Sequence, residues 1–308
     1  MTFQVNHTVV EDTFAEAFRM WGARLIVTAC NEYWVQTAAQ EACSYGTSVI
    51  GCDAEAGIEC TYTCDQTPDG RPGIALLMLA FNAKAVAKAV LSRVGQCLMT
   101  CPTTAVYDGL PDANKAEDSA RMDMGKSLRF FGDGFQKSKM IGKRRFWRVP
   151  VMDGEFVVEE SIGATKAIGG GNFLICGKDQ NMTLDAAQRA VNAIKPIANV
   201  ITPFPGGVVR SGSKVGSRYK TMFASTNDAY CPTLRGRTDT RLHTDANCVY
   251  EIVINGLDTQ SISSAMRAGI EAACSGTGIC TISAGNYGGK LGKFHFKLHD
   301  VLQGTTAQ

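Results

Sequence analysis

Hydrophobic and polar residues form two series of strand-like and helix-like patterns along the chain, and both series follow the same order. In the first series, short apolar runs are separated by stretches in which apolar residues recur every three or four positions. These patterns predict strands at 23–29, 48–50 and 73–80, a helix that carries Trp34, Val35, Ala38, Ala39 and Ala42 and ends near Gly46, and a helix that carries Val86, Val90, Val94 and Leu98.

The second series repeats this order in the C-terminal half. It predicts strands at 172–176, 200–202, 248–254 and 280–283, a helix from Thr183 with Leu184, Ala187, Val191 and Ile194 on one face, and a helix with Ile262, Met266 and Ile270 on one face. The order strand, helix, strand, strand, helix, strand is typical of the ferredoxin-like arrangement. We therefore predict an α+β protein with two ferredoxin-like (βαββαβ) lobes.

An inserted region between the two series has the pattern of antiparallel hairpins. Strand-like runs at 126–131, 145–151 and 155–158 are separated by glycine-containing turn sequences. We assign residues 1–150 to the first lobe and residues 151–291 to the second. A C-terminal strand at 292–302 is a candidate to return to the first lobe.

One predicted strand of the second lobe carries a single acid among apolar residues. Residues 247–256 read NCVYEIVING, in which Glu251 is the charged position. So little polarity is typical of a strand that is covered on both faces, where an ionised carboxylate is costly to bury unless it is paired. We therefore expect Glu251 either to hold a proton near neutral pH, which suits proton transfer, or to meet a cation. A structural ion pair or a wet interface is the alternative.

The composition is that of a folded chain with sizeable cores. A length of 308 residues allows about two domains, and a hydrophobic content of 45% excludes disorder. The 31 basic and 29 acidic residues nearly cancel, so the net charge predicts no binding to nucleic acid or to a membrane. Apolar runs are shorter than a membrane helix, and the N-terminus has no signal-peptide pattern, so we expect a cytoplasmic protein.

Twelve cysteines raise the question of a metal site or disulfides. The pairs Cys60/Cys64 and Cys97/Cys101 are each four positions apart, but the chain has no CxxC pair, and the four histidines are dispersed. A disulfide framework suits small secreted proteins. We therefore expect scattered free thiols and no metal.

Two glycine-rich segments follow predicted strands. In residues 203–207 (PFPGG), Gly206 and Gly207 allow backbone N–H groups to face a substrate oxygen. Residues 283–290 (SAGNYGGK) contain Gly288 and Gly289 and add an amide, a phenol and an ammonium group. Neither segment fits the dinucleotide fingerprint or the P-loop. Tight turns without a ligand are the alternative for both.

The predicted hairpin region carries a cluster of basic residues. They are Lys137, Lys139, Lys143, Arg144, Arg145 and Arg148. A solvated hairpin face explains such a cluster without a ligand. If the cluster binds a ligand, an acidic small molecule fits better than a duplex, because aromatic residues for stacking are not interleaved.

Several uncommon sequence blocks follow one another from one end of the chain to the other. They are residues 11–18 (EDTFAEAF), 54–58 (AEAGI), 67–73 (TPDGRPG), 95–97 (GQC), 203–207 (PFPGG), 224–232 (ASTNDAYCP), 250–256 (YEIVING) and 282–292 (ISAGNYGGKLG). With these blocks the chain closely resembles the formylmethanofuran:tetrahydromethanopterin formyltransferase family. The resemblance covers almost the whole chain.

The resemblance implies an activity and an assembly. The activity is transfer of a formyl group between the amine of a methanofuran-type carrier and a ring nitrogen of tetrahydromethanopterin or its dephospho form. Both coenzymes would be co-substrates, with no permanently bound cofactor. The assembly is a homotetramer built as a dimer of dimers, and in bacterial relatives it belongs to a formyltransferase/hydrolase complex. The near-neutral charge of this chain favours a bacterial member.

The resemblance also places the catalytic glutamate of the family at Glu251. We predict that this residue moves a proton within a ternary complex, with no covalent formyl-enzyme. Backbone N–H groups of the glycine-rich segments are candidates to stabilise an oxyanion. The predicted substrate-binding residues are Gly206, Gly207, Asn227, Tyr230, Asn286, Gly288, Gly289 and Lys290.

Two other functions remain open from the sequence. A non-catalytic subunit that binds the carrier and scaffolds a multi-enzyme complex would not need a costly buried acid. A folate-type one-carbon transferase would differ in its pterin preference.

Overall fold

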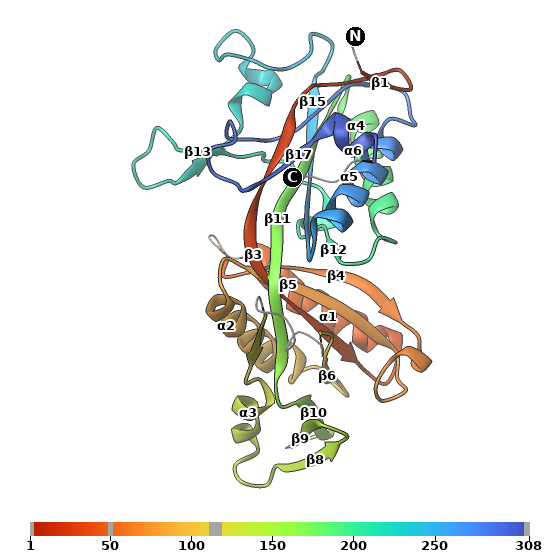
Figure 1. Ribbon diagram of the computed structural model, residues 1–308, viewed down its shortest axis with the longest axis vertical. Helices are drawn as coiled ribbons and strands as arrows, with labels where there is room; N and C mark the ends of the chain where they lie inside the picture. Colours follow the sequence, from red (N-terminus) through yellow and green to blue (C-terminus); the bar gives the residue numbers. More distant parts are fainter. Residues whose placement is uncertain (1–2, 49–51, 111–118, 305–308) are drawn as a thin grey trace. The chain divides into compact units, whose positions relative to one another are not determined.

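The computed structural model describes residues 3–48, 52–110 and 119–304 and shows a mixed α/β protein with a large mixed sheet. The chain forms two compact units. Unit 1 consists of Met1–Arg19 and Ile168–Gln308, and unit 2 of Met20–Ala167. Strands β3 (Phe14–Thr28) and β11 (Ile162–Gly177) are long enough to contribute residues to both units (Figure 1).

Strand β3 is the central strand of unit 2. It pairs antiparallel with β5 on one edge and with β6 on the other, and β4 pairs antiparallel with the far edge of β5. The strand order is therefore β4-β5-β3-β6. The elements of this part are α1 (Glu32–Ser48), β4 (Glu55–Tyr62), β5 (Gly73–Ala80), α2 (Ala83–Arg93), which a π-helical turn continues to Leu98, and β6 (Ala105–Asp108).

The remaining part of unit 2 extends this sheet beyond β6. Strand β10 pairs parallel with β6, and β10, β9 and β8 form an antiparallel meander, while β7 pairs antiparallel with β11. The elements are β7 (Ser119–Met122), α3 (Gly125–Leu128), a 3₁₀ turn (Arg129–Gly132), β8 (Lys137–Ile141), β9 (Arg144–Val151) and β10 (Gly154–Glu159).

Strand β11 is the central strand of unit 1. It pairs antiparallel with β15 and with β16, β12 pairs with the other edge of β15, and β2 pairs parallel with β16. A short strand, β17, pairs with the first residues of β3. The elements are β1 (Gln4–Val5), β2 (Thr8–Val10), α4 (Gln180–Ile194), β12 (Val200–Ile201), β13 (Lys214–Val215), β14 (Ala224–Ser225), β15 (Cys248–Gly256), α5 (Thr259–Ala273), β16 (Ile279–Ser283), β17 (Phe294–Lys297) and α6 (Leu298–Leu302).

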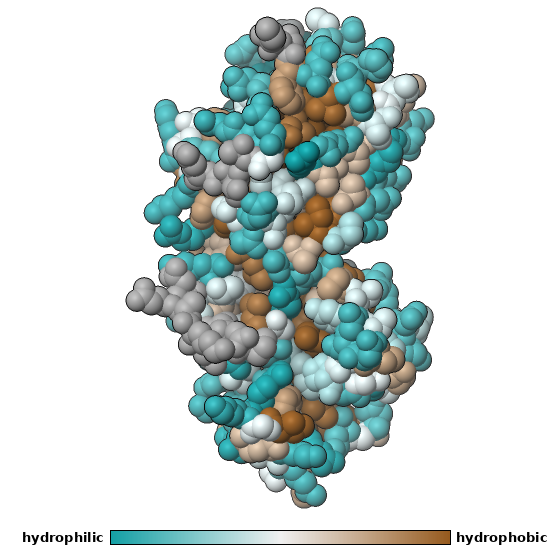
Figure 2. All heavy atoms as spheres, turned by 45° about the vertical axis from the view of Figure 1, so that its right-hand side comes forward, coloured by the Kyte–Doolittle hydropathy of each residue, from teal (hydrophilic) through white to brown (hydrophobic). Residues whose placement is uncertain are grey.

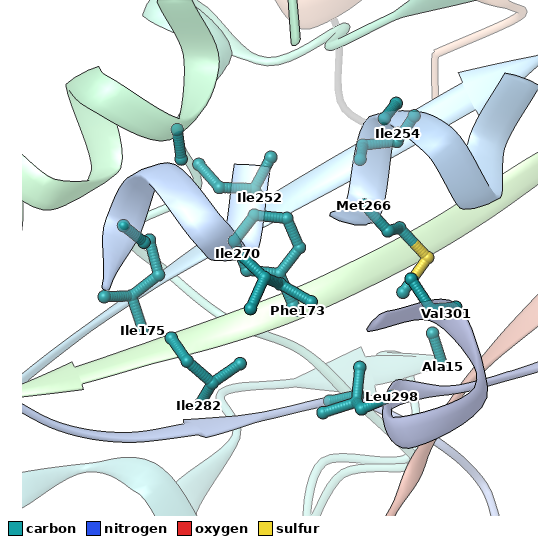
Figure 3. Packing of buried hydrophobic residues seen from close by; sticks show 14 of the residues in the cluster. Ala15, Phe173, Ile175, Ile252, Ile254, Met266, Ile270, Ile282, Leu298 and Val301 are labelled. Carbon is teal, nitrogen blue, oxygen red and sulfur yellow. The ribbon is translucent and has the colours of Figure 1, made fainter. Parts of the chain in front are cut away.

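Side-chain caps set the starts of the two long helices of unit 1. Asp179 accepts a hydrogen bond from the N–H of Met182 at the start of α4, and Asp258 accepts one from Ser261 at the start of α5. Apolar residues at helical spacing then face the sheet. Figure 3 shows Met266 and Ile270 of α5 beside Phe173 of β11. This helix–sheet core supports β11 and β15 from one side.

Most predicted elements are confirmed with extended ends. Strand β5 has the predicted bounds 73–80, whereas β3 and β11 are much longer than predicted, and α1 continues two residues past Gly46. The sequence of β4 reads EAGIECTY and was not predicted as a strand. Within the predicted strand at 48–50, Ser48 is helical, and 49–50 lie outside the described residues.

Two further predictions were wrong. Residues 126–131 form α3 and a 3₁₀ turn instead of a strand, because local contacts favour a helical turn: Ser127 donates to the carbonyl of Asp123, and the Arg129 guanidinium stacks over the Trp147 ring at 4.5 Å. The predicted strand at 292–302 is extended only over β17 and then becomes helix α6.

The close packing of α5 generates a stability prediction. A Cβ atom at Gly269 would lie 2.8 Å from Cζ of Phe173 and 2.9 Å from Cδ1 of Ile194. We expect Gly269→Ala to lower the free energy of unfolding by about 1–2 kcal/mol, because overpacking outweighs the gain of about 1 kcal/mol in helix propensity. Urea unfolding measures this change. Glu271→Ala on the exposed face of α5 is the control and should stay within about 0.5 kcal/mol; a Gly269→Ala protein that is more stable than the wild type would contradict the packing argument.

Candidate active site

The backbone of Glu251 is held on both edges of β15. On one edge Glu251 lies opposite Leu174 of β11. On the other, its N–H donates to the carbonyl of Val209 at 3.0 Å, and its carbonyl accepts from the N–H of Val209 at 2.8 Å. The acid therefore lies on a strand with partners on both sides, so its side-chain direction is set by the sheet.

Cross-strand register brings Glu251 and Ser283 to the same face of the sheet. Leu174 lies opposite Glu251 on one side and opposite Ser283 of β16 on the other, and directly opposite residues project to the same face. A pocket of about 820 Å³ covers part of this face. Its lining residues are Leu174, Phe204, Pro205, Val208, Val209, Arg210, Ser211, Gly212, Thr226, Asn227, Tyr230, Cys231, Pro232, Thr233, Val249 and Glu251.

The two faces of β15 differ, which corrects the prediction that both are fully covered. Tyr250, Ile252 and Ile254 are buried in the helix–sheet core, whereas Val249 and Glu251 on the opposite face are half-buried and line the pocket. The strand combines an apolar side that anchors it with a side that opens to a pocket.

Burial dominates the protonation of Glu251. It raises the pKa of this carboxyl group from 4.5 to about 7, and the described residues provide no ion pair to this carboxylate. Of the two predicted outcomes, the structure therefore favours an acid that holds a proton near neutral pH over one that meets a cation. Near pH 7 both the acid and its conjugate base are well populated, which suits a group that gives and takes a proton.

Backbone conformation and close packing explain the glycines of segment 203–207. Gly206 and Gly207 both have positive φ, and a Cβ atom at Gly207 would lie 2.8 Å from Val191 of α4. The N–H of Gly207 donates to the carbonyl of Phe204. A tight turn without a ligand therefore explains the glycine at position 207. Phe204 and Pro205 line the pocket that contains Glu251.

The second glycine-rich segment is organised by Glu16, which is only 1% exposed. The two carboxylate oxygens of Glu16 accept four backbone N–H groups at 2.6–2.9 Å, from Tyr287, Gly289, Leu291 and Gly292. Burial opposes ionisation, but the four donors outweigh it and lower the pKa of Glu16. The acid holds this loop in place.

The predicted substrate-binding residues separate into two groups. Asn227 and Tyr230 line the same pocket as Glu251. In the loop held by Glu16, Asn286 donates to Thr13 and Phe14 and accepts from Gly288, and Lys290 is exposed. The N–H groups of Gly288 and Gly289 are thus donated to Asn286 and Glu16.

The loop held by Glu16 nevertheless lies close to the Glu251 pocket through Tyr287. Burial, together with the charges of Glu251 and Glu16, raises the pKa of the Tyr287 hydroxyl group, and a hydrogen bond with Ser213 opposes that rise. The sequence pointed to the phenol group of Tyr287 within segment 283–290 but gave no role to Glu16 or Ser283.

Thiols and carboxylates show no metal-binding arrangement in the described part of the chain. The twelve cysteines are free, and residues 3–48, 52–110 and 119–304 contain no group of three or more His, Cys, Asp or Glu side chains placed to hold a metal ion. Burial raises the pKa of Cys43 to about 12, so this thiol is a poor ligand.

The basic cluster of the hairpin region is partly neutralised. Arg144 pairs with Glu159, Arg145 with Glu160 at 3.4 Å and Arg148 with Glu155 at 2.5 Å. The three lysines of the cluster are exposed. These cross-strand ion pairs account for half of the cluster without a ligand.

A larger pocket, of about 1130 Å³, lies in unit 2 beside α3 and the turn that precedes β10. Its lining is mostly apolar and includes Met99, Leu128 and Met152. Its carboxylate, Asp153, accepts the N–H of Thr103 at 2.7 Å and so has a structural role. The Glu251 pocket is the better candidate for chemistry because it contains an acid with a strongly raised pKa.

Two family models together match nearly the whole chain. One, described as formylmethanofuran-tetrahydromethanopterin formyltransferase, matches residues 3–151, and the other, described as the proximal lobe of the same protein, matches residues 154–301. The chain belongs to this formyltransferase family. The resemblance that the sequence blocks indicated is thereby confirmed.

Relatives within the formyltransferase family match from end to end. The formylmethanofuran–tetrahydromethanopterin formyltransferase of Methylobacillus flagellatus is 53% identical over 97% of this chain and 99% of its own. The solved formyltransferase of Methanosarcina barkeri is 48% identical, with a TM-score of 0.91 over 97% of this chain and 100% of its own. A chain of the formyltransferase/hydrolase complex of Methylorubrum extorquens, solved with methylofuran, is 46% identical, with a TM-score of 0.92 over 98% and 99%.

The buried carboxylate of this family member generates a second stability prediction. We expect Glu16→Gln to lower the free energy of unfolding by about 2–4 kcal/mol, because charge-assisted bonds to several N–H groups are lost. The pKa of Glu16 is lower in the folded state than its ordinary value of 4.5, so the ionised carboxylate stabilises the fold at pH values above 4.5. This stabilisation is lost as the pH falls through the lowered pKa of the folded state.

The pH dependence of this difference is the critical measurement. Urea unfolding of the wild type and of Glu16→Gln between pH 3 and pH 8 should show a difference that is full above about pH 4.5 and shrinks below it. The exposed Glu271→Gln should show no such trend. A difference between the wild type and Glu16→Gln that is independent of pH would contradict an ionised, N–H-bonded Glu16.

Proposed function

We propose that this chain transfers a formyl group between formylmethanofuran, or a bacterial methanofuran-like carrier, and a ring nitrogen of tetrahydromethanopterin or its dephospho form. The observation that carries the proposal is identity of about half the residues, over 97% of the chain, to proteins named for this reaction. The raised pKa of Glu251, in a pocket of about 820 Å³, supports the proposal on chemical grounds.

The proposed role of Glu251 is to move one proton between two nitrogens. The lone pair of the attacking nitrogen forms a bond to the formyl carbon, and the carbonyl becomes an oxyanion. Protonated Glu251 gives its proton to the leaving nitrogen, whose bond to carbon breaks, and the carboxylate takes the proton that the attacking nitrogen loses. The acid ends as it began, so no co-reactant is needed.

We propose direct attack in a ternary complex, without a covalent intermediate. Positioning of two reactants side by side can supply a large part of the barrier reduction. Asn227 and Tyr230 lie in the pocket with Glu251 and are proposed to bind substrate. Asn286 and Lys290 are proposed to contribute from the neighbouring loop, in which Lys290 is exposed and free to reach a carrier.

Oxyanion stabilisation is proposed to come from backbone N–H groups of the glycine-rich segments. Gly206, Gly207, Gly288 and Gly289 all have positive φ, which turns their peptide groups out of regular structure. The N–H groups of Gly207, Gly288 and Gly289 donate within the protein here, so each must exchange its partner for the oxyanion. Each donor that reaches the oxyanion is worth about 3 kcal/mol.

We also propose that both lobes are ferredoxin-like. Supporting this, the order β3-α1-β4-β5-α2-β6 in unit 2 has its counterpart β11-α4-β12-β15-α5-β16 in unit 1, and both groups are wholly antiparallel. Lobe bounds of 1–150 and 151–291 are supported by the two family models, which meet between residues 151 and 154, whereas the compact units assign residues 1–19 and 151–167 the other way. Return of the C-terminal segment to the first lobe is proposed on the pairing of β17 with residues 14–17 of β3, which these bounds place in the first lobe although they pack within unit 1.

A homotetramer, alone or within a formyltransferase/hydrolase complex, is the proposed assembly. Large apolar side chains are exposed in the segment from α3 to the β8–β9 turn of unit 2: Phe130, Phe131, Phe135, Met140 and Ile141. The space-filling view shows hydrophobic atoms at the surface at its lower end, at the height of β8–β10 in Figure 1 (Figure 2). Such exposure is typical of interaction surfaces.

Among the described residues, no helix has the length and apolarity to span a membrane.

Replacement of Glu251 by Gln tests the proposed function. We expect the rate of formyl transfer from formylmethanofuran to tetrahydromethanopterin to fall by about 10²–10⁴-fold, because the amide cannot move a proton, while tetrahydromethanopterin binding persists. Glu271→Gln on α5 should retain wild-type activity. Equal rates in the wild type and Glu251→Gln would instead favour the carrier-binding, scaffolding subunit.

The pKa of Glu251 predicts how activity and stability depend on pH. Because the protonated acid starts the reaction, the activity should fall as the pH rises through about 7. The folded state binds this proton more tightly than the unfolded state, so wild-type stability should fall relative to Glu251→Gln as the pH rises from about 4.5 to 7. Urea unfolding of both proteins at several pH values measures the second effect independently of activity, and a constant difference would argue against a raised pKa.

A further inference from the structure

Three polar side chains form a hydrogen-bonded chain that begins at Tyr230 in the wall of the Glu251 pocket. The phenol oxygen of Tyr230 lies 2.8 Å from Oγ of Ser283, and that hydroxyl group donates to Oε2 of Glu11 at 2.5 Å. Tyr230 is 9% exposed and Ser283 is 1% exposed. A 2.5 Å bond to a carboxylate oxygen is in the range of strong, charge-assisted hydrogen bonds.

The direction of this chain follows from the supply of hydrogens. Ser283 has one hydroxyl hydrogen, which it donates to Glu11, so it can only accept from Tyr230. Tyr230 also has one hydroxyl hydrogen, which is then directed at Ser283. The phenol oxygen is left as an acceptor for any further hydrogen bond.

Sheet geometry places the partner of the phenol group, Ser283, on the same face as the acid of the site. Ser283 and Glu251 lie on the same face with Leu174 between them, two strand spacings or about 10 Å apart. Tyr230 packs against Leu174 and lines the pocket that contains Glu251. Tyr230 therefore connects Ser283 with the pocket into which Glu251 projects.

We propose that Tyr230 is a catalytic residue whose oxygen accepts a hydrogen bond from the primary amine nitrogen of the carrier, and that Ser283 and Glu11 are positioning residues that hold this oxygen in its acceptor state. That nitrogen leaves in one direction of transfer and attacks in the other. As an amine it bears two hydrogens, so one can pass to or from Glu251 while the other meets Tyr230. The inference rests on the formyl transfer proposed above and names how the site receives an amine. Glu251 moves the proton, and Tyr230 orients the carrier's nitrogen.

This arrangement aids the transition state more than the ground state. The carrier's nitrogen gains positive charge when Glu251 protonates it as it leaves, or when it bonds to the formyl carbon as it attacks, and its N–H then becomes a stronger donor. An acceptor aligned with that N–H therefore strengthens during the reaction and raises kcat more than it lowers KM. Burial raises the pKa of Tyr230, so the phenol keeps the hydrogen that it gives to Ser283.

A double-mutant cycle with Tyr230→Phe and Glu11→Gln tests the proposal. Phenylalanine keeps the buried ring and removes only the hydroxyl group. We expect Tyr230→Phe to lower kcat about tenfold with KM within about twofold of wild type, the loss of one well-placed hydrogen bond. Glu11→Gln should lower kcat several-fold, and the combined variant should be no slower than Tyr230→Phe, because Glu11 acts through Tyr230.

Two results would overturn the proposal. One is a kcat of Tyr230→Phe within about twofold of wild type. The other is a combined variant in which the two losses multiply, because that would make the roles of Glu11 and Tyr230 independent. Urea unfolding of each variant identifies a loss of folding, and Ser283→Ala replaces Glu11→Gln in the cycle if the latter does not fold. Glu271→Gln is the control for a change of surface charge.

The same assays distinguish this inference from the proposed function. If the wild type transfers formyl groups, Glu251→Gln does not, and the Tyr230 and Glu11 variants behave as wild type, the inference is wrong and the proposed function stands. If the wild type transfers no formyl group from formylmethanofuran to tetrahydromethanopterin, both are wrong.

Discussion

Backbone hydrogen bonds on both edges of β15 set the direction in which Glu251 points, and the other properties of the site follow from them. The alternation of a strand sends Tyr250 and Ile252 into the helix–sheet core when Glu251 faces the pocket. A shift of register by one residue would exchange these faces at a large cost in burial. The apolar core of unit 1 therefore keeps a poorly solvated acid in place, although the acid itself contributes nothing favourable to folding near neutral pH.

The elements that can be predicted from the local sequence are those whose hydrophobic pattern does not depend on a distant partner residue. Strand β5 is a continuous apolar run between glycine and polar residues, and its predicted bounds are those of the structure. Strand β4 was missed because Glu59 looks like a surface residue. Glu59 is buried, and the Arg24 guanidinium, 35 positions earlier, compensates its charge by donating to both of its carboxylate oxygens. A two-residue interaction across the sheet cannot be read from either segment alone.

The candidate site divides in a similar way. Glu251 stands out in the sequence because its neighbours on both sides are apolar, and Asn227 and Tyr230 belong to a block that the family resemblance identifies. Glu11, Glu16 and Ser283 also lie in blocks of that resemblance, 11–18 and 282–292, but no role was predicted for them, since each is an ordinary residue type in an ordinary setting. Their importance arises from contacts with residues more than 270 positions away, which depend on the completed fold.

Glu16 has a consequence for how unit 1 matures. Its most distant donor, Gly292, lies 276 positions later in the chain. During synthesis, the acid therefore leaves the ribosome long before the groups that compensate its charge exist. An ionised carboxylate is costly to enclose without such donors. Strand β3 must consequently stay hydrated around Glu16 until the loop that contains Gly292 has emerged, so closure of this unit waits for that loop.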